Sequence, residues 1–184
     1  MPNELKNKRQ HLRQAWKKYS ELWHRIEVPA KSILLKEGDI ARKAYLIEKG
    51  CIRVWFNHQG KEISFQFFFE GDVVSSTESF RKRVPSRYTI ETIEPSIIRW
   101  ISKSDLDTVI RENDFLNHYL MDWAVDRQAE FIQHFFSFLK DNPQQRYKDL
   151  LLQKPRIIQR VPLQYIASYL GITPVSLSRI RNKM

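Results

Sequence analysis

The last twenty residues of the chain, YIASYLGITPVSLSRIRNKM, contain two short helical patterns joined at a glycine. Their apolar positions are spaced as in two crossing helices, at Ile166, Leu170, Ile172, Leu177 and Ile180. Gly171 suits a turn that needs a positive φ, and the small Ala167 allows a close approach of the second helix. Thr173-Pro174 provides an N-cap followed by a proline at the first helical position. These features predict a helix-turn-helix whose second helix spans about 174–183, with an ordinary helical hairpin as the alternative.

Burial of the apolar positions turns a hydroxylated and basic set of side chains outward on the second helix. The candidate DNA-binding residues are Thr173, Val175, Ser176, Ser178, Arg179, Arg181, Asn182 and Lys183. Arg179 is suited to a bidentate contact with guanine, and Val175 to a thymine methyl group. Thr173, Ser176, Arg181 and Lys183 are better suited to phosphates, although a solvated role for Arg181 is the alternative.

The formal charge of +10 is concentrated at the two ends of the chain. Residues 1–25 carry seven basic and two acidic side chains, and residues 140–184 carry nine basic and two acidic ones. This asymmetry favours a polyanion as partner, nucleic acid before a membrane, and a basic surface kept for solubility is the alternative. No apolar run approaches the roughly 20 residues that span a bilayer, and no signal-peptide core is present, so we expect a cytoplasmic protein.

Helical and strand-like patterns divide the chain into four predicted parts. Residues 3–26 have helical apolar spacing, which favours an N-terminal helical segment at 1–27. Short β-favouring runs separated by glycine turns follow, and they predict a β-barrel such as a jelly roll at 28–112. Within this part the pattern turns helical at Ser104, which is expected to cap a helix at 105–111. A long helix at 113–140 and a helix-turn-helix domain at 141–184 complete the prediction, with Asn142-Pro143 starting a helix and a short linker after Pro155.

The long helix is apolar on more than one side, so it must be covered on more than one side. One side is expected to lie on the barrel and the other on a second copy of the same helix, because twofold homodimers are the commonest assembly. A helix buried within one subunit is the alternative. The predicted dimer interface consists of Phe115, Tyr119, Trp123, Phe131, Phe135 and Phe138.

Catalytic and metal-binding motifs are absent from the sequence. The five histidines have no metal-ligand spacing, and there is neither a GxSxG elbow nor a glycine-rich phosphate loop. The single cysteine, Cys51, excludes an intrachain disulfide and a four-cysteine metal or iron–sulfur site. We therefore expect neither an enzyme nor a metalloprotein.

Five stretches give the chain a resemblance to the Crp/Fnr superfamily of bacterial transcription regulators, in particular to its compact Bacteroidetes members. They are LKEGDIARKAYLIEKGCIRVWF, KEISFQFFFEGDVVSSTESF, PSRYTIETIE, PQQRYKDLL and VPLQYIASYLGITPVSLSRIR. The resemblance implies an α+β fold with an N-terminal jelly roll like that of cyclic-nucleotide-binding domains, a long dimerisation helix and a C-terminal helix-turn-helix domain without a full wing. It also implies a homodimer on palindromic double-stranded DNA, with RNA polymerase as a candidate partner.

The resemblance locates a candidate effector pocket at Gly71, Ser75, Ser76, Glu78, Ser86 and Arg87. Cyclic-nucleotide-binding relatives place a glycine and a glutamate where this chain has Ser75 and Ser76. The phosphate-binding arginine position falls at Ser86, and a shift of one residue to Arg87 turns a strand side chain to the opposite face. We therefore expect a sequence-specific transcription regulator whose effector is unknown and is not cyclic AMP. A small-molecule or protein-interaction module with a vestigial helix-turn-helix is the alternative.

Overall fold

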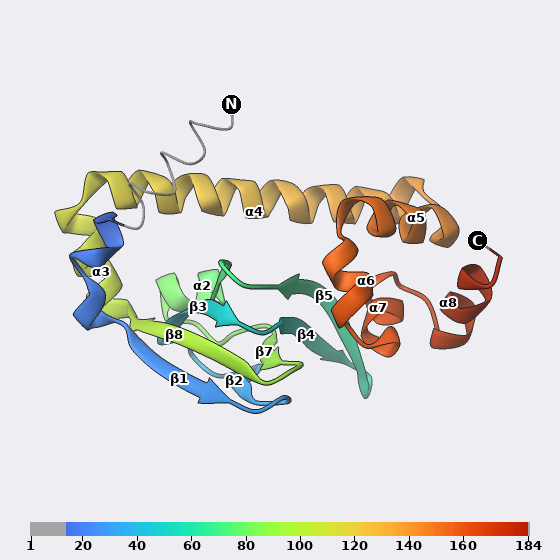
Figure 1. Cartoon of the computed structure of the whole chain (residues 1–184), viewed down its shortest axis with the longest axis horizontal. Helices are drawn as coiled ribbons and strands as arrows, with labels where there is room; N and C mark the ends of the chain where they lie inside the picture. Colours follow the sequence, from blue (N-terminus) through green and yellow to red (C-terminus); the bar gives the residue numbers. More distant parts are fainter. Residues whose placement is uncertain (1–13, 184) are drawn as a thin grey trace.

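The segment from residue 24 to residue 102 forms two antiparallel sheets that pack face to face (Figure 1). The sheets have the strand orders β1-β8-β3-β6 and β2-β7-β4-β5. The strands are β1 (His24–Val28), β2 (Ile33–Leu35), β3 (Lys43–Lys49), β4 (Ile52–His58), β5 (Lys61–Phe68), β6 (Val73–Val74), β7 (Thr89–Thr92) and β8 (Ser96–Ser102). This computed structural model, which describes residues 14–183, thus has the double-sheet arrangement of a jelly roll.

The core of this barrel lies between the two sheets. Ile52 and Val54 of β4, Ile90 of β7, and Ile98 and Ile101 of β8 are buried there. β-branched side chains of this kind pack well on a pleated surface, and their removal from water supplies the main driving force for the sandwich.

The long helix α4 (Asp114–Lys140) runs above the barrel, and the other helices lie mainly at its two ends (Figure 1). The helices are the 3-10 turn η1 (Ser20–Leu22), α2 (Thr77–Lys82), α3 (Lys103–Glu112), α4, α5 (Pro143–Gln153), α6 (Pro155–Arg160), α7 (Leu163–Tyr169) and α8 (Pro174–Arg181). The long helix α4 connects α3 at one end of the barrel with α5 at the other. Asn113 caps α4 and Asn142 caps α5, each by accepting a hydrogen bond from the backbone N–H three residues later. The predicted α+β fold class is confirmed.

The helical prediction for residues 3–26 is wrong at its C-terminal end. Residues 14–17 are helical and η1 follows, but the chain becomes strand β1 at His24. β1 pairs with β8 along its whole length, from His24 opposite Trp100 to Val28 opposite Ser96. These ladder hydrogen bonds, together with the packing of Ile26 on the barrel core, override the local helical spacing. Residues 3–13 of the prediction lie outside the described part of the chain.

Two smaller predictions also need correction. Ser102, and not Ser104, caps α3, because its hydroxyl oxygen accepts the backbone N–H of Asp105 at 3.1 Å. The segment after Pro155, predicted as a linker, is the helix α6, which begins at that proline and buries Ile157. Neither α2 nor β6 was predicted, because both are too short to show a period.

A second hydrophobic core joins the C-terminal helices to the outside of the barrel. Cys51, Phe67 and Phe69 of the barrel are buried in one cluster with Ile166, Ala167, Leu170 and Leu177 of the helix-turn-helix. Burial raises the pKa of the Cys51 thiol well above its ordinary value, so the side chain acts as a small hydrophobic group. The C-terminal helices are therefore packed on the barrel rather than held by a free linker.

Candidate nucleic-acid interface and ligand cavity

The helix-turn-helix has the local geometry that its sequence predicts. Gly171 adopts a φ of +66° at the turn, and a Cβ atom there would lie 2.7 Å from Cε1 of Phe138. Thr173 caps α8 by accepting the backbone N–H of Ser176 at 3.1 Å. Leu177 is buried between the two helices, and Ile172 and Ile180 pack against the same cluster. Glycine therefore suits both the left-handed backbone and the close approach of the Phe138 ring at this turn.

The candidate DNA-binding side chains lie on the outer surface of α8, at the end of the molecule opposite α3 (Figure 1). Val175, Ser178, Arg179 and Asn182 are exposed, as are Thr173, Arg181 and Lys183. Ser176 is half-buried, and its hydroxyl group lies 3.0 Å from that of Thr173. Within residues 14–183, neither Arg179 nor Arg181 forms an ion pair, so both guanidinium groups are available to an external anion.

The first helix of the unit, α7, is fixed to the barrel by polar contacts. The backbone N–H of Ser64 donates to the hydroxyl oxygen of Ser168 at 2.9 Å, and that hydroxyl donates to the carbonyl oxygen of Glu62 at 3.0 Å. Next to this contact, the buried guanidinium of Arg53 lies 3.8 Å from the ring centroid of Tyr165. Sequence analysis missed Arg53, whose one signal is its position inside an apolar run of β4.

Ion pairs hold α6 to the same side of the barrel. Arg160 donates to Glu70 at 2.8 and 2.7 Å and also pairs with Glu94, while Arg156 donates to Glu70. The hydrogen bonds from Arg160 lower the pKa of Glu70 to about 2. Together with the Arg53 contact, these pairs determine where α7 and α8 sit relative to the sheets.

A cavity of about 450 Å³ lies between the barrel, α2 and α4. Its lining residues are Phe56, Phe65, Ser76, Glu78, Ser79, Pro85, Arg87, Tyr88 and Phe131. Three of the six predicted pocket residues, Ser76, Glu78 and Arg87, are among them.

The other three predicted pocket residues serve the fold. Gly71 is in a turn, where its N–H donates to the carbonyl oxygen of Ile47 at 2.9 Å. The hydroxyl of Ser75 donates to the carbonyl oxygen of Lys43 at 3.0 Å, and Ser86 is buried behind the cavity wall. The cavity is therefore centred farther toward Phe65 and α4 than the sequence predicted, because α4 supplies Phe131 to its wall.

The predicted dimer-interface residues do not share one face of α4. Phe115 and Phe135 are exposed, whereas Tyr119 and Trp123 are half-buried. Phe131 and Phe138 are also partly exposed, but Phe131 lines the cavity of its own barrel and Phe138 lies next to Gly171 and the guanidinium of Arg146. Sequence analysis grouped these six side chains because periodicity does not show which apolar stripe the barrel covers. Further exposed apolar side chains on α4 are Met121, Val125, Ile132, Phe136 and Leu139.

Among residues 14–183 there is no group of three or more metal-ligating side chains. No helix in the same range is both long enough and apolar enough to cross a membrane.

Comparison with known proteins supports this architecture. Residues 25–113 match the family model of the cyclic nucleotide-binding domain. FixK2 from Bradyrhizobium japonicum is similar over 88% of this chain and 83% of its own, with a TM-score of 0.77 and 17% identity. A CooA mutant from Carboxydothermus hydrogenoformans is similar over 89% of this chain and 76% of its own, with a TM-score of 0.72 and 16% identity. The c-di-GMP responsive global regulator CLP from Xanthomonas campestris is similar over 92% of this chain and 90% of its own, with a TM-score of 0.72 and 16% identity. A search of the curated proteins found no match.

The double-sheet part of the chain is therefore a domain of the cyclic nucleotide-binding type, followed by a long helix and a helical C-terminal unit. The chain shares its fold with FixK2, CooA and CLP over most of its length, so the fold that the resemblance predicted is confirmed.

Proposed function

We propose that the protein is a homodimeric transcription regulator that binds palindromic double-stranded DNA through α8. The observation that carries this proposal is the outer surface of α8, where exposed short and basic side chains are presented on a helix fixed by α7 and the barrel. The regulator CLP, which has a similar fold, links cell–cell signalling to virulence gene expression in Xanthomonas campestris.

In this proposal, Arg179 contacts a guanine and Val175 packs on a thymine methyl group. Arg181 and Lys183, together with the hydroxyl groups at the start of α8, contact phosphates and position the helix in the major groove. The net positive charge of residues 140–184 attracts the DNA and makes binding sensitive to salt.

A second copy of the chain covers the exposed stripe of α4 in this proposal. Six exposed residues on the helix follow the alternating spacing of three and four that a coiled-coil seam requires: Met121, Val125, Gln128, Ile132, Phe135 and Leu139. Five of them are apolar. Gln128 is the polar member near the middle, and a single polar residue in a seam favours one register over others. This set replaces the predicted interface and retains only Phe135 from it.

The dimer must present its two copies of α8 about 34 Å apart, because adjacent major grooves on one face of DNA have that spacing. The cavity wall includes Phe131 of α4, so a ligand in the cavity touches the helix that sets this distance. Regulation is then a shift in population between two dimer geometries.

The experiment that tests the proposal is the selection of binding sites from a random pool of duplex DNA with the purified full-length protein. We expect enrichment of an inverted repeat whose half-sites lie about one helical turn apart. Arg179→Ala should lose about 1–3 kcal/mol of preference at one base pair of each half-site. The matched variant Arg181→Ala should weaken binding to all sequences alike and reduce the salt slope by about 1.

Weak binding without enrichment would contradict the proposal. Equal effects of the two arginine variants on base preference would contradict the assigned roles of Arg179 and Arg181. The first result would favour a ligand-binding module whose helix-turn-helix no longer reads DNA.

A further inference from the structure

The cavity beneath α4 is built mainly from aromatic side chains. Phe65 is at its centre, with ring centroids 5.3 Å from Tyr88, 6.1 Å from Phe56 and 6.4 Å from Phe131. The contacts with Tyr88 and Phe131 are edge-to-face, which is a favourable arrangement for aromatic rings. A volume of about 450 Å³ is within the range of small-molecule sites, and apolar walls are typical of them.

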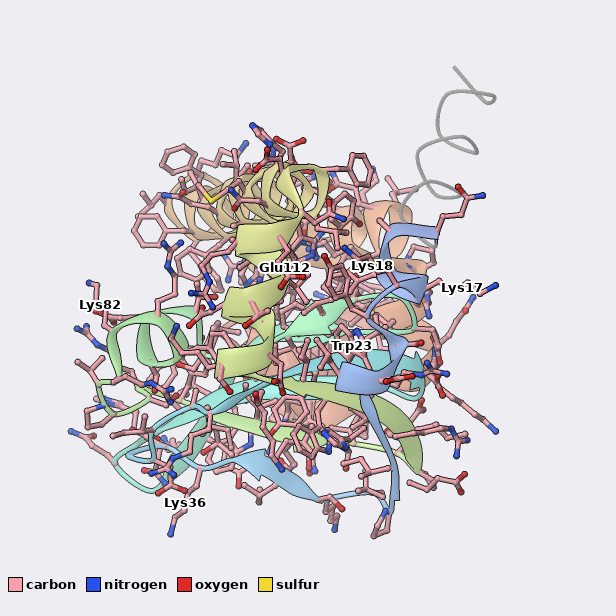
Figure 2. The ribbon with its side chains drawn as sticks, turned by 90° about the vertical axis from the view of Figure 1, so that its left-hand side faces the viewer. Lys17, Lys18, Trp23, Lys36, Lys82 and Glu112 are labelled. Carbon is pink, nitrogen blue, oxygen red and sulfur yellow. The ribbon has the colours of Figure 1, made fainter. Side chains whose placement is uncertain are left out.

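The charges at this cavity do not favour a phosphate. Among the described lining residues, Arg87 is the only cation, and its side chain is 82% exposed. Its Nε lies 3.5 Å from a carboxylate oxygen of Glu78, which also lines the cavity and would repel an anion. Lys82 pairs with the same carboxylate at 3.4 Å and extends outward from α2, at the edge of the molecule (Figure 2). The two charged residues that line the cavity, Glu78 and Arg87, therefore have opposite charges, and the lining itself has no net charge for a charged ligand to match.

The serine hydroxyl groups at the cavity are already bonded to the protein, and the hydroxyl of Tyr88 lies 3.4 Å from the carbonyl oxygen of Ser75. The oxygen of Ser86 lies 3.0 Å from that of Ser76 and 2.7 Å from the carbonyl oxygen of Tyr88. The hydroxyl oxygen of Ser79 accepts the backbone N–H of Ala41 at 2.8 Å. A ligand rich in hydroxyl groups, such as a ribose, would therefore lose hydrogen bonds to water without regaining them here.

From these observations we propose that the cavity binds a small, uncharged, largely aromatic or aliphatic molecule, and that Phe131 is the residue through which α4 contacts it. The inference rests on the proposed function for its regulatory meaning, since such a ligand would change the position of α4. The aromatic walls supply affinity through the burial of apolar surface, and the neutral Glu78–Arg87 pair at the rim disfavours charged competitors.

The test is a fluorescence titration of the full-length protein with N-phenyl-1-naphthylamine, an uncharged aromatic probe that brightens in apolar sites. Phe131→Ala and Phe136→Ala form a matched pair, because both residues are on α4 and are 46% and 52% exposed, but only Phe131 lines the cavity. We expect about a tenfold loss of probe affinity in Phe131→Ala, of the order expected for removing a buried phenyl contact, and a change below twofold in Phe136→Ala. Phe56→Ala, in the opposite wall, should also weaken binding, and cyclic AMP should not displace the probe.

Four results would overturn the inference. The probe could fail to bind, it could bind all three variants as tightly as the unchanged protein, or cyclic AMP could displace it. Equal losses in Phe131→Ala and Phe136→Ala would likewise overturn it, since the probe would then bind the outer surface of α4 rather than the cavity. The titration contains no DNA, so its failure is distinguishable from failure of the site selection.

Discussion

The ion pairs of the buried Arg53 guanidinium allow the loss in the free energy of unfolding on their removal to be predicted from the structure. Arg53 is 1% exposed, and its Nη2 lies 2.6 Å from a carboxylate oxygen of Glu91 and 2.6 Å from one of Glu62. The same guanidinium stacks on Tyr165 of α7. We predict that Arg53→Met destabilises both the barrel and its contact with the helix-turn-helix.

The magnitude follows from the different burial of the two carboxylates. The side chain of Glu91 is 10% exposed, and without Arg53 it retains one side-chain donor, Nε1 of Trp55 at 2.9 Å. Removing one partner of a buried pair costs about 3–5 kcal/mol, because the other charge stays desolvated. The side chain of Glu62 is 47% exposed, so Glu62→Gln should cost no more than about 1 kcal/mol.

Urea unfolding followed by tryptophan fluorescence measures these differences, at one protein concentration because a dimer would make stability concentration-dependent. Arg53→Met should lower the free energy of unfolding by about 3–5 kcal/mol. The double variant Arg53→Met with Glu91→Leu should recover most of this loss, since neither charge then remains in the barrel. A loss below about 1 kcal/mol in Arg53→Met, or no recovery in the double variant, would refute the reasoning.

Two further predictions concern α4. Ile132→Asp places a charge in the proposed seam, so light scattering should show a monomer instead of a dimer. The control Leu152→Asp changes an exposed residue of α5 and should leave a dimer. A dimer in both variants would contradict the seam. The second prediction concerns His134, because burial lowers the pKa of its side chain from an ordinary 6.5 to about 4. As the pH falls, the unfolded chain is protonated at this histidine before the folded protein, so the free energy of unfolding should fall between about pH 6.5 and 4. His134→Phe keeps an aromatic ring stacked on Tyr169 but cannot be protonated, so it should reduce the pH dependence of the urea unfolding midpoint between about pH 6.5 and 4. An unchanged pH dependence would contradict the role given to His134.

Local chemistry in the sequence was enough to predict the helix-turn-helix and most strands. The N-cap of Thr173, the turn at Gly171 and the start of α5 after Asn142 each depend on hydrogen bonds or backbone angles within a few residues. Such features are visible in one sequence because the interacting groups are neighbours in it. Alternation of apolar residues in the middle of the chain likewise predicted the barrel, since its strands have one face in the core.

The tertiary structure alone decided which side of each element is covered. Helical spacing on α4 shows several apolar stripes, and only the placement of the barrel decides that Phe131 lines the cavity whereas its neighbour Ile132 does not. Strand β1 exists because β8 offers it a free edge, and Arg53 is buried because Tyr165, far along the chain, covers it. These outcomes depend on contacts between segments that are far apart in the sequence, and local patterns such as helical spacing or N-caps do not specify such contacts.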